Sequence, residues 1–262
     1  MKYKNISNLV DLKTFKRPLI IAHRGCRDQY PENTCAAFKA AIDAQIQMIE
    51  FDVMLSRDRK IVVIHDATLE RTTNGHGPVS NYTLEELKRL DAGSWFDSRF
   101  SQEHIPTLKE ALDTMANRVC INIELKASAY EANRPFDRVE RQVVKMIKEK
   151  NICDSVIISS FEWKMLEDIS KVDGAPAIGL ISRDPTDNNN RDLCARLKVF
   201  SWHPNFNGLD YEQVKEMHEM AIKVFPYKIT SLKQYEEAVN MGVDGVITSS
   251  PIIIGKAQQV RM

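Results

Sequence analysis

The most constraining feature of this chain is the alternation of short apolar runs with segments of helical spacing. Strand-sized runs occupy residues 19–22, 48–55, 119–125, 156–159, 177–181, 199–202, 223–227 and 243–248. Segments with helical periodicity or capping residues lie between most of them. Eight strands with intervening helices in 262 residues match an α/β fold of the (β/α)8 barrel type. An open doubly wound sheet is the alternative, but no Gly-x-Gly-x-x-Gly motif follows any of these strands.

One segment interrupts the alternation early in the chain. Residues 61–66 follow a polar turn after the second strand and are typical of a hairpin return. Residues 67–105 then form a stretch that is too long for an ordinary connection. We therefore predict one domain, residues 1–262, with an inserted subdomain at about 67–105 over the mouth of the barrel.

Composition excludes several classes of partner. Lys and Arg together number 36 and balance 36 Asp and Glu, so no basic excess favours binding to nucleic acid. No apolar run reaches transmembrane length, and the first ten residues lack the apolar core of a signal peptide. Five scattered cysteines without Cys-x-x-Cys spacing indicate reduced thiols. We expect a cytoplasmic protein without stable membrane insertion.

Three acidic residues lie in strands that are otherwise apolar. Glu50 and Asp52 are two positions apart, so both side chains point to one face of their strand, and Glu124 comes late in another. Neighbouring carboxylates resist joint ionisation unless a cation lies between them. Their oxygen ligands suit one divalent cation, Mg²⁺ or Ca²⁺. The alternative is that they form ion pairs with Arg24 and Lys126 and bind no metal.

Two histidines follow strands whose ends we expect at the same mouth. His23 and His65 flank the predicted acidic cluster and are suited to act as general base and general acid. Arg24 and Lys126 add positive charge for an anion, an arrangement typical of phosphoryl chemistry. Gly25 permits a sharp turn, and we expect it to leave room for the substrate.

A set of motifs along the chain resembles those of the glycerophosphodiester phosphodiesterase family. The motifs span about residues 18 to 251, in the order in which the family has them. They are His23-Arg24-Gly25, Pro31-Glu-Asn-Thr34, Glu50-Phe-Asp52-Val53, His65-Asp66, Ile105-Pro-Thr-Leu108, Glu124-Leu-Lys126 and Gly242-Val-Asp-Gly-Val-Ile-Thr248. His-Arg-Gly alone is a weak signal, whereas the ordered set with its spacing is specific.

The resemblance implies a barrel with a small insertion after the second strand and a metal-dependent hydrolase. Such enzymes convert glycerophosphodiesters to glycerol 3-phosphate and an alcohol, often through a cyclic phosphate. Carried over by position, the metal ligands would be Glu50, Asp52 and Glu124. The acid–base pair would be His23 and His65, and the phosphate ligands would be Arg24 and Lys126.

The chain departs from the family pattern at one late strand, which carries Tyr227-Lys228-Ile229-Thr230 instead of a Trp-Thr pair followed by Asn. We expect the ring of Tyr227 to pack on the glycerol carbons of a small-molecule substrate. Lys228 either favours an additional anionic group on that substrate or is simply solvated. Trp202 ends a strand and is a further substrate-binding candidate, with packing in the core as the alternative.

Other functions fit part of this pattern. A lysophospholipase-D-type phosphodiesterase would use the same site together with an apolar groove. A non-catalytic phosphoester-binding barrel would be expected to lack some of the histidines or acids, all of which this chain retains. The leaving alcohol, the choice between Mg²⁺ and Ca²⁺, the order of the two histidines and the oligomeric state stay open.

Overall fold

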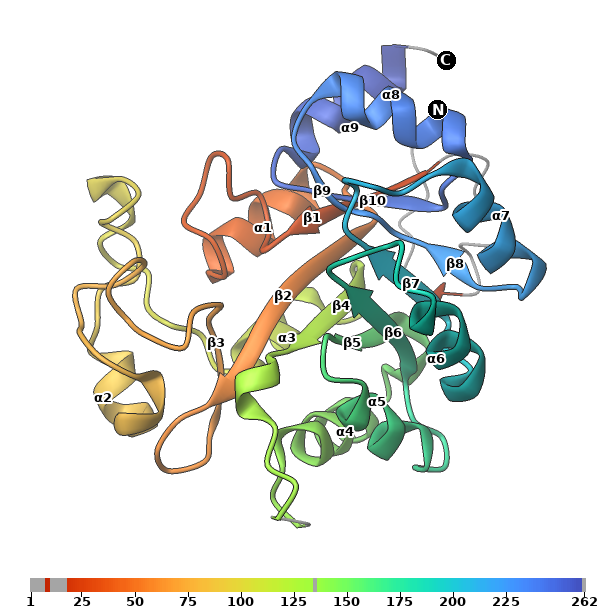
Figure 1. The fold of residues 1–262 in the computed structure, drawn as a ribbon. Helices are drawn as coiled ribbons and strands as arrows, with labels where there is room; N and C mark the ends of the chain where they lie inside the picture. The colour runs from red at the N-terminus through yellow and green to blue at the C-terminus, as the bar shows by residue number, and fades with distance from the viewer. Residues whose placement is uncertain (1–7, 10–17, 134–135, 261–262) are drawn as a thin grey trace.

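The computed structural model describes residues 8–9, 18–133 and 136–260. Its strands curl around a central axis (Figure 1). They are β1 (Leu19–His23), β2 (Met48–Leu55), β3 (Ile61–Val63), β4 (Cys120–Leu125), β5 (Val156–Ser160), β6 (Ala177–Ser182), β7 (Ser201–Pro204), β8 (Lys223–Val224), β9 (Tyr227–Ile229) and β10 (Gly245–Thr248). All neighbours in the order β8-β7-β6-β5-β4-β2-β1-β10-β9 pair in parallel, and β3 pairs antiparallel with β2.

The barrel closes through β8 and β9, which together occupy the position of a single strand. Phe225 N donates to the Trp202 carbonyl oxygen at 2.9 Å, and Ile247 N donates to the Pro226 carbonyl oxygen at 3.0 Å. Pro226 lacks an N–H group and cannot continue the ladder on both sides, which explains the break. The predicted strand at 223–227 is therefore two short strands, and the predicted (β/α)8 fold is confirmed.

Helices surround the sheet in Figure 1. The α-helices are α1 (Cys35–Asp43), α2 (Leu84–Lys88), α3 (Leu108–Met115), α4 (Val139–Glu149), α5 (Trp163–Ser170), α6 (Asn189–Leu197), α7 (Tyr211–Glu219), α8 (Leu232–Met241) and α9 (Pro251–Val260). Short 3-10 turns occur at Val79–Asn81, Ser98–Phe100, Ala127–Ala129 and Cys153–Ser155. Helix α9 was not predicted, because its apolar residues directly continue the last strand in the sequence.

The two faces of the strands bury different kinds of side chain. Outward residues such as Ile20 and Ile49 pack beneath the helices in the largest apolar cluster. Inward residues near the amino ends, including Leu19, Ile21 and Phe225, fill the lower part of the barrel. Apolar side chains therefore fill the lower part of the barrel, and polar residues become more frequent toward the carboxyl ends of the strands.

The segment 67–105 packs beside the β2–β3 hairpin. Leu69, Val79 and Leu87 from this segment share an apolar cluster with Met54 and Val62 of the hairpin. In Figure 1 the segment lies to one side of the strands, next to β3, and its predicted position over the mouth stays a prediction.

No helix in the described part of the chain is long and apolar enough to cross a membrane. Residues 1–7 and 10–17, which include most of the stretch behind the predicted cytoplasmic location, lie outside the described residues. That location and the single-domain boundary 1–262 stay predictions.

Candidate active site

The three predicted acids meet inside the barrel. Asp52 on β2 lies beside Glu124 on β4 in the parallel register, and Glu50 is one pleat earlier on the same face. All three are buried, and they can offer ligand oxygens that lie within 4.8 Å of one another. The period of two in β2 therefore gives the cluster that the sequence predicts.

The described cations of the protein do not balance every carboxylate of this cluster. Burial, together with Asp52 and Glu124, raises the pKa of Glu50 well above its usual range. Burial and the charge on Asp52 raise the pKa of Glu124 to about 7. Among the described residues, no Lys, Arg or His forms an ion pair with Glu50, and its Oε1 is buried without a hydrogen-bond partner. An unpaired carboxylate oxygen facing two more carboxylates fits a hard divalent cation.

Two protein cations reach the same cluster. Arg24 Nε lies 3.3 Å from Asp52 Oδ2, while Lys126 Nζ lies 3.2 Å from Asp52 Oδ1 and 2.7 Å from Glu124 Oε1. Although burial opposes ionisation of Asp52, these cations hold the pKa of its carboxyl below the usual range. The ion pairs considered as the alternative to a metal site therefore form, but they do not include Glu50.

His23 and His65 both line the cavity above the acids. His23 ends β1 next to Glu50 in the register, and its Nδ1 lies 3.4 Å from Ser249 Oγ. The Nδ1 atom of His65 lies 2.5 Å from Asp66 Oδ1, which leaves Nε2 for a reacting group. Burial is the largest effect on both imidazoles and, with the charge on Arg24, lowers the pKa of each, while the charge on Asp52 opposes this shift.

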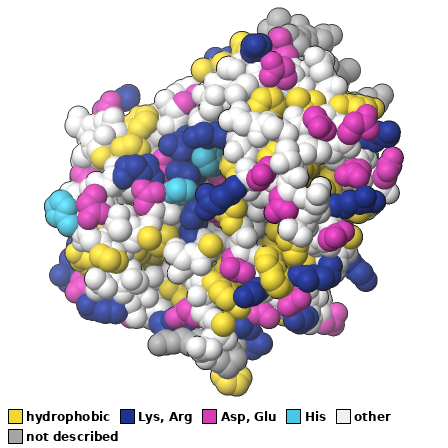
Figure 2. Space-filling model, viewed as in Figure 1, with side chains coloured by type: hydrophobic (Ala, Val, Ile, Leu, Met, Phe, Trp, Pro, Cys, Tyr) yellow, Lys and Arg dark blue, Asp and Glu magenta, His cyan; other side chains and the backbone are white. Residues whose placement is uncertain are grey.

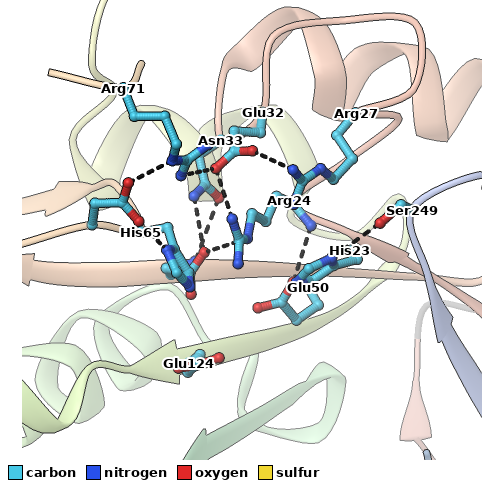
Figure 3. A network of polar contacts seen from close by, with 12 residues as sticks. His23, Arg24, Arg27, Glu32, Asn33, Glu50, His65, Arg71, Glu124 and Ser249 are labelled. Atoms are coloured by element: carbon cyan, nitrogen blue, oxygen red, sulfur yellow. Dashed lines mark hydrogen bonds and ion pairs between the residues drawn. The ribbon is translucent and has the colours of Figure 1, made fainter. Parts of the chain in front are cut away.

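A buried glutamate organises the cations beside the histidines, and the sequence interpretation assigned it no role. Glu32 lies between three arginines, at 2.8 Å from Arg24, 2.8 Å from Arg27 and 2.7 Å from Arg71 (Figure 3). Arg71 also contacts Asp66 at 2.5 Å, so the network extends to the partner of His65. The Pro31-Glu-Asn-Thr34 motif marked this place, but its long-range partners have no local signal.

The backbone of the same turn is also specialised. Asn33 has a φ of 59° and its Nδ2 donates to Asp52 Oδ2 at 2.9 Å. Gly25 has a φ of 80°, and a Cβ atom there would lie 2.7 Å from Ala37 of α1. The expectation that Gly25 makes room for substrate is therefore wrong, because the missing side chain makes room for helix α1.

The site opens into a cavity of about 1000 Å³ at the carboxyl ends of the strands. In the view of Figure 2, Lys and Arg side chains gather around a hollow that contains histidine. Tyr227 lines the cavity, with its Oη donating to the Ser182 carbonyl oxygen at 3.1 Å.

Trp202 does not line this cavity. It is 1% exposed, packs in the outer cluster beneath the helices and donates from Nε1 to Ser182 Oγ at 2.9 Å. The alternation of β7 turns the next residue, His203, inward instead. The substrate-binding prediction for Trp202 is therefore wrong, and the core alternative is correct.

Comparison with known proteins agrees with this geometry. Residues 23–253 match the model of the glycerophosphoryl diester phosphodiesterase family. A glycerophosphodiester phosphodiesterase of Caldanaerobacter subterraneus subsp. tengcongensis is 38% identical over 240 residues, which are 90% of this chain and 95% of the relative. A protein of the same name from Bacillus altitudinis is 36% identical over 236 residues, or 88% of this chain and 94% of the relative.

A solved structure extends the likeness to three dimensions. An Oleispira antarctica phosphodiesterase, determined in complex with the product sn-glycerol-3-phosphate, is similar with a TM-score of 0.82 and 30% sequence identity. The match covers 95% of this chain and 99% of that one. The chain therefore belongs to the glycerophosphoryl diester phosphodiesterase family, whose members are phosphoric diester hydrolases.

Proposed function

We propose that this protein hydrolyses glycerophosphodiesters to glycerol 3-phosphate and an alcohol, with a divalent cation bound at the carboxylate cluster. The observation that carries the proposal is the convergence of three buried carboxylates beneath two histidines that face one cavity. The product named for the Oleispira antarctica relative supports the same reaction.

The residues that would hold the cation are Glu50, Asp52 and Glu124. Their donor set is all oxygen, and the unpaired Oε1 of Glu50 leaves a buried anionic position to be compensated. This chemistry fits Mg²⁺ or Ca²⁺. When bound, such a cation would neutralise charge on the phosphate and acidify a hydroxyl group next to it.

The two histidines would move the protons of the reaction. In the first step, the glycerol 2-hydroxyl oxygen forms a bond to phosphorus as the bond to the leaving alcohol breaks. One imidazole takes the proton of the hydroxyl while the other gives a proton to the leaving oxygen. In the second step water opens the resulting cyclic phosphate, with the two imidazoles exchanging roles.

Positive charge and an aromatic face would position the substrate. Arg24 and Lys126 line the cavity next to the carboxylates and are placed to bind the phosphate oxygens. Burial opposes protonation of Lys126, but Asp52 and Glu124 raise its pKa, so it remains a cation. The ring of Tyr227 would pack on the glycerol carbons from the other side of the cavity.

Release of glycerol 3-phosphate from glycerophosphodiesters tests the proposal. We expect turnover with Mg²⁺ or Ca²⁺ and its loss in excess EDTA, with recovery when the cation is restored. Glu124→Gln should reduce kcat/KM by at least about a hundredfold, since it removes one anionic ligand from the cluster. Full activity in excess chelator would contradict the metal assignment.

Replacement of the histidines tests the proton transfers. We expect His23→Ala and His65→Ala each to lower kcat by about 10² to 10⁴. His76→Ala is the matched control, because His76 is exposed and does not line the cavity. Unchanged hydrolysis in both cavity variants would contradict the acid–base assignment.

A further inference from the structure

Four Lys or Arg side chains line the cavity, and they differ in their partners. Arg24 and Lys126 form ion pairs with the buried carboxylates. Arg183 and Lys228 line the same cavity, and among the described residues neither forms an ion pair with a carboxylate. Two cations of this pocket are therefore left for a ligand.

These two residues come from a different part of the barrel than the acids. Arg183 directly follows β6, which is separated from β4 by β5, and Lys228 lies on β9, which is separated from β1 by β10. The acidic residues that line the cavity are Glu50, Asp66 and Glu124. Glu50 lies on β2, Glu124 lies on β4 and Asp66 follows β3, so none of the described acidic residues that line the cavity comes from β6, β7 or β9.

Arg183 is exposed, and its guanidinium group lies over one aromatic ring. Its guanidinium carbon lies 4.6 Å from the ring centre of Phe161, and Phe161 meets Tyr227 edge to face at 6.0 Å. A guanidinium that stacks by its face keeps the N–H groups at its edge free for an anion. The three side chains all line the cavity, so the guanidinium group lies near the ring proposed to contact glycerol.

Lys228 lies among other cations. Lys228 is exposed; desolvation and the charges on Arg27 and Arg24 lower the pKa of its ammonium group, and the charge on Glu32 opposes this shift. Arg24 and Arg27 have Glu32 as a partner, whereas Lys228 has no carboxylate partner among the described residues. An anion bound beside Lys228 would therefore relieve repulsion that the free protein retains.

We propose that Arg183 and Lys228 select glycerophosphodiesters whose leaving alcohol carries a second anionic group, a phosphate or a carboxylate. The inference rests on the proposed function and adds the chemical class of the alcohol. The reacting phosphate has the cation site, Arg24 and Lys126, so Arg183 and Lys228 are available to the alcohol. Cationic alcohols such as choline would face two unpaired positive charges there and are disfavoured.

A matched series of substrates tests this selection. We compare kcat/KM for diesters whose leaving alcohol is glycerol, glycerol 3-phosphate, glycerate or choline. The expected order places the two anionic alcohols about tenfold above neutral glycerol, and choline below it. Raised ionic strength should reduce the advantage of the anionic substrates. The two anionic arms distinguish a phosphate from a carboxylate as the preferred group.

Variants connect the selection to the two residues. Arg183→Gln and Lys228→Gln should each lower the ratio of kcat/KM for the anionic over the neutral substrate by about threefold, so that the two together account for the tenfold advantage. Lys228→Arg should retain the ratio, because it keeps the charge. Lys39→Gln is the control, since Lys39 is an exposed lysine on α1 outside the cavity.

The outcomes separate the two proposals. Equal kcat/KM for neutral and anionic alcohols in the wild-type protein would overturn the selection while the proposed hydrolase function stands. A ratio that both glutamine variants leave unchanged would also overturn it. Absence of hydrolysis for every diester, with cation present, would overturn the proposed function and the selection together.

Discussion

Glu50 and Asp52 have opposite electrostatic environments although one residue separates them on β2. Asp52 faces Arg24 and Lys126 at 3.3 Å and 3.2 Å, and these charges lower its pKa despite complete burial. Among the described residues, the Glu50 carboxylate accepts only from the backbone N–H of Arg24, through Oε2 at 3.0 Å, and the pKa of Glu50 is raised. The protein thus neutralises Asp52 with its own cations, whereas Glu50 would be compensated by the proposed cation.

Gly25 provides a stability test for the turn that carries Arg24. We expect Gly25→Ala to be more destabilising than Gly242→Ala, although their φ values, 80° and 79°, are nearly the same. The left-handed conformation costs about 1–2 kcal/mol in either variant. Only at Gly25 would the new Cβ meet Ala37, at 2.7 Å, which adds about 1–3 kcal/mol of overpacking. Urea unfolding of both variants measures the difference.

Equal destabilisation of these two variants would contradict the steric role of Gly25. The comparison needs no assay of activity, so it is independent of the proposed function. It also distinguishes packing against α1 from the earlier expectation of space for substrate.

The sequence predicted individual site residues where the local pattern determines the direction of a side chain. Glu50, Asp52 and Glu124 converge because strand periodicity and parallel register place them on one face. The network through Glu32 and Arg71 was not predictable, because these residues are 39 positions apart and meet only in the folded chain.

Helix α3 illustrates how the elements begin where polar residues satisfy free backbone groups. Thr107 Oγ1 accepts from the backbone N–H of Glu110, and the Glu110 side chain accepts from the N–H of Thr107 at 2.7 Å. This capping box was visible in the sequence, and the helix begins at Leu108 as it requires. Capping signals therefore locate helix starts better than apolar periodicity alone.

Two threonines on this helix allow a matched test of the cap. We expect Thr107→Ala to reduce the free energy of unfolding by about 1 kcal/mol, because it leaves the backbone N–H of Glu110 without its partner. Thr114→Ala should have a smaller effect or stabilise slightly. Thr114 is inside the helix, where its Oγ1 donates to the Glu110 carbonyl oxygen at 2.9 Å. Alanine has a higher helix propensity than threonine and does not need this hydrogen bond. Chemical denaturation of both variants gives the comparison, and a larger loss at Thr114 would contradict the capping role.

Strands were harder to predict where the phase of the alternation was ambiguous. The strand predicted at 199–202 is observed as β7 at Ser201–Pro204. The pleat of this strand determines whether Trp202 or His203 faces the site. Trp202 packs outward and His203 inward. In a four-residue strand with large side chains on both faces, the sequence does not indicate which face points into the barrel.

The whole barrel is layered, and this layering determines which groups titrate during acid unfolding. Apolar side chains fill its lower part, and polar groups lie above them in a largely buried environment. Burial in this environment disfavours the charged form of His203 and lowers its pKa to about 3. In the unfolded chain a histidine has its ordinary pKa of about 6.5. Because the pKa of His203 differs between the folded and unfolded states, the stability of the protein depends on pH.

The sign of this coupling gives a prediction for the complete protein. Between about pH 6.5 and 3 the unfolded chain binds a proton at His203 that the native barrel does not, so stability falls as the pH falls. From pH 6 to pH 4, protonation of His203 in the unfolded chain should lower the free energy of unfolding by about 2 kcal/mol.

We expect His203→Asn to be less stable at pH 7, because His203 Nε2 lies 2.8 Å from Ser201 Oγ in the buried interior. The variant should nevertheless lose about 2 kcal/mol less than the wild type between pH 6 and pH 4, since asparagine does not titrate. Unfolding by urea at a series of pH values measures both slopes, and parallel curves for the two proteins would show that His203 does not carry the coupling.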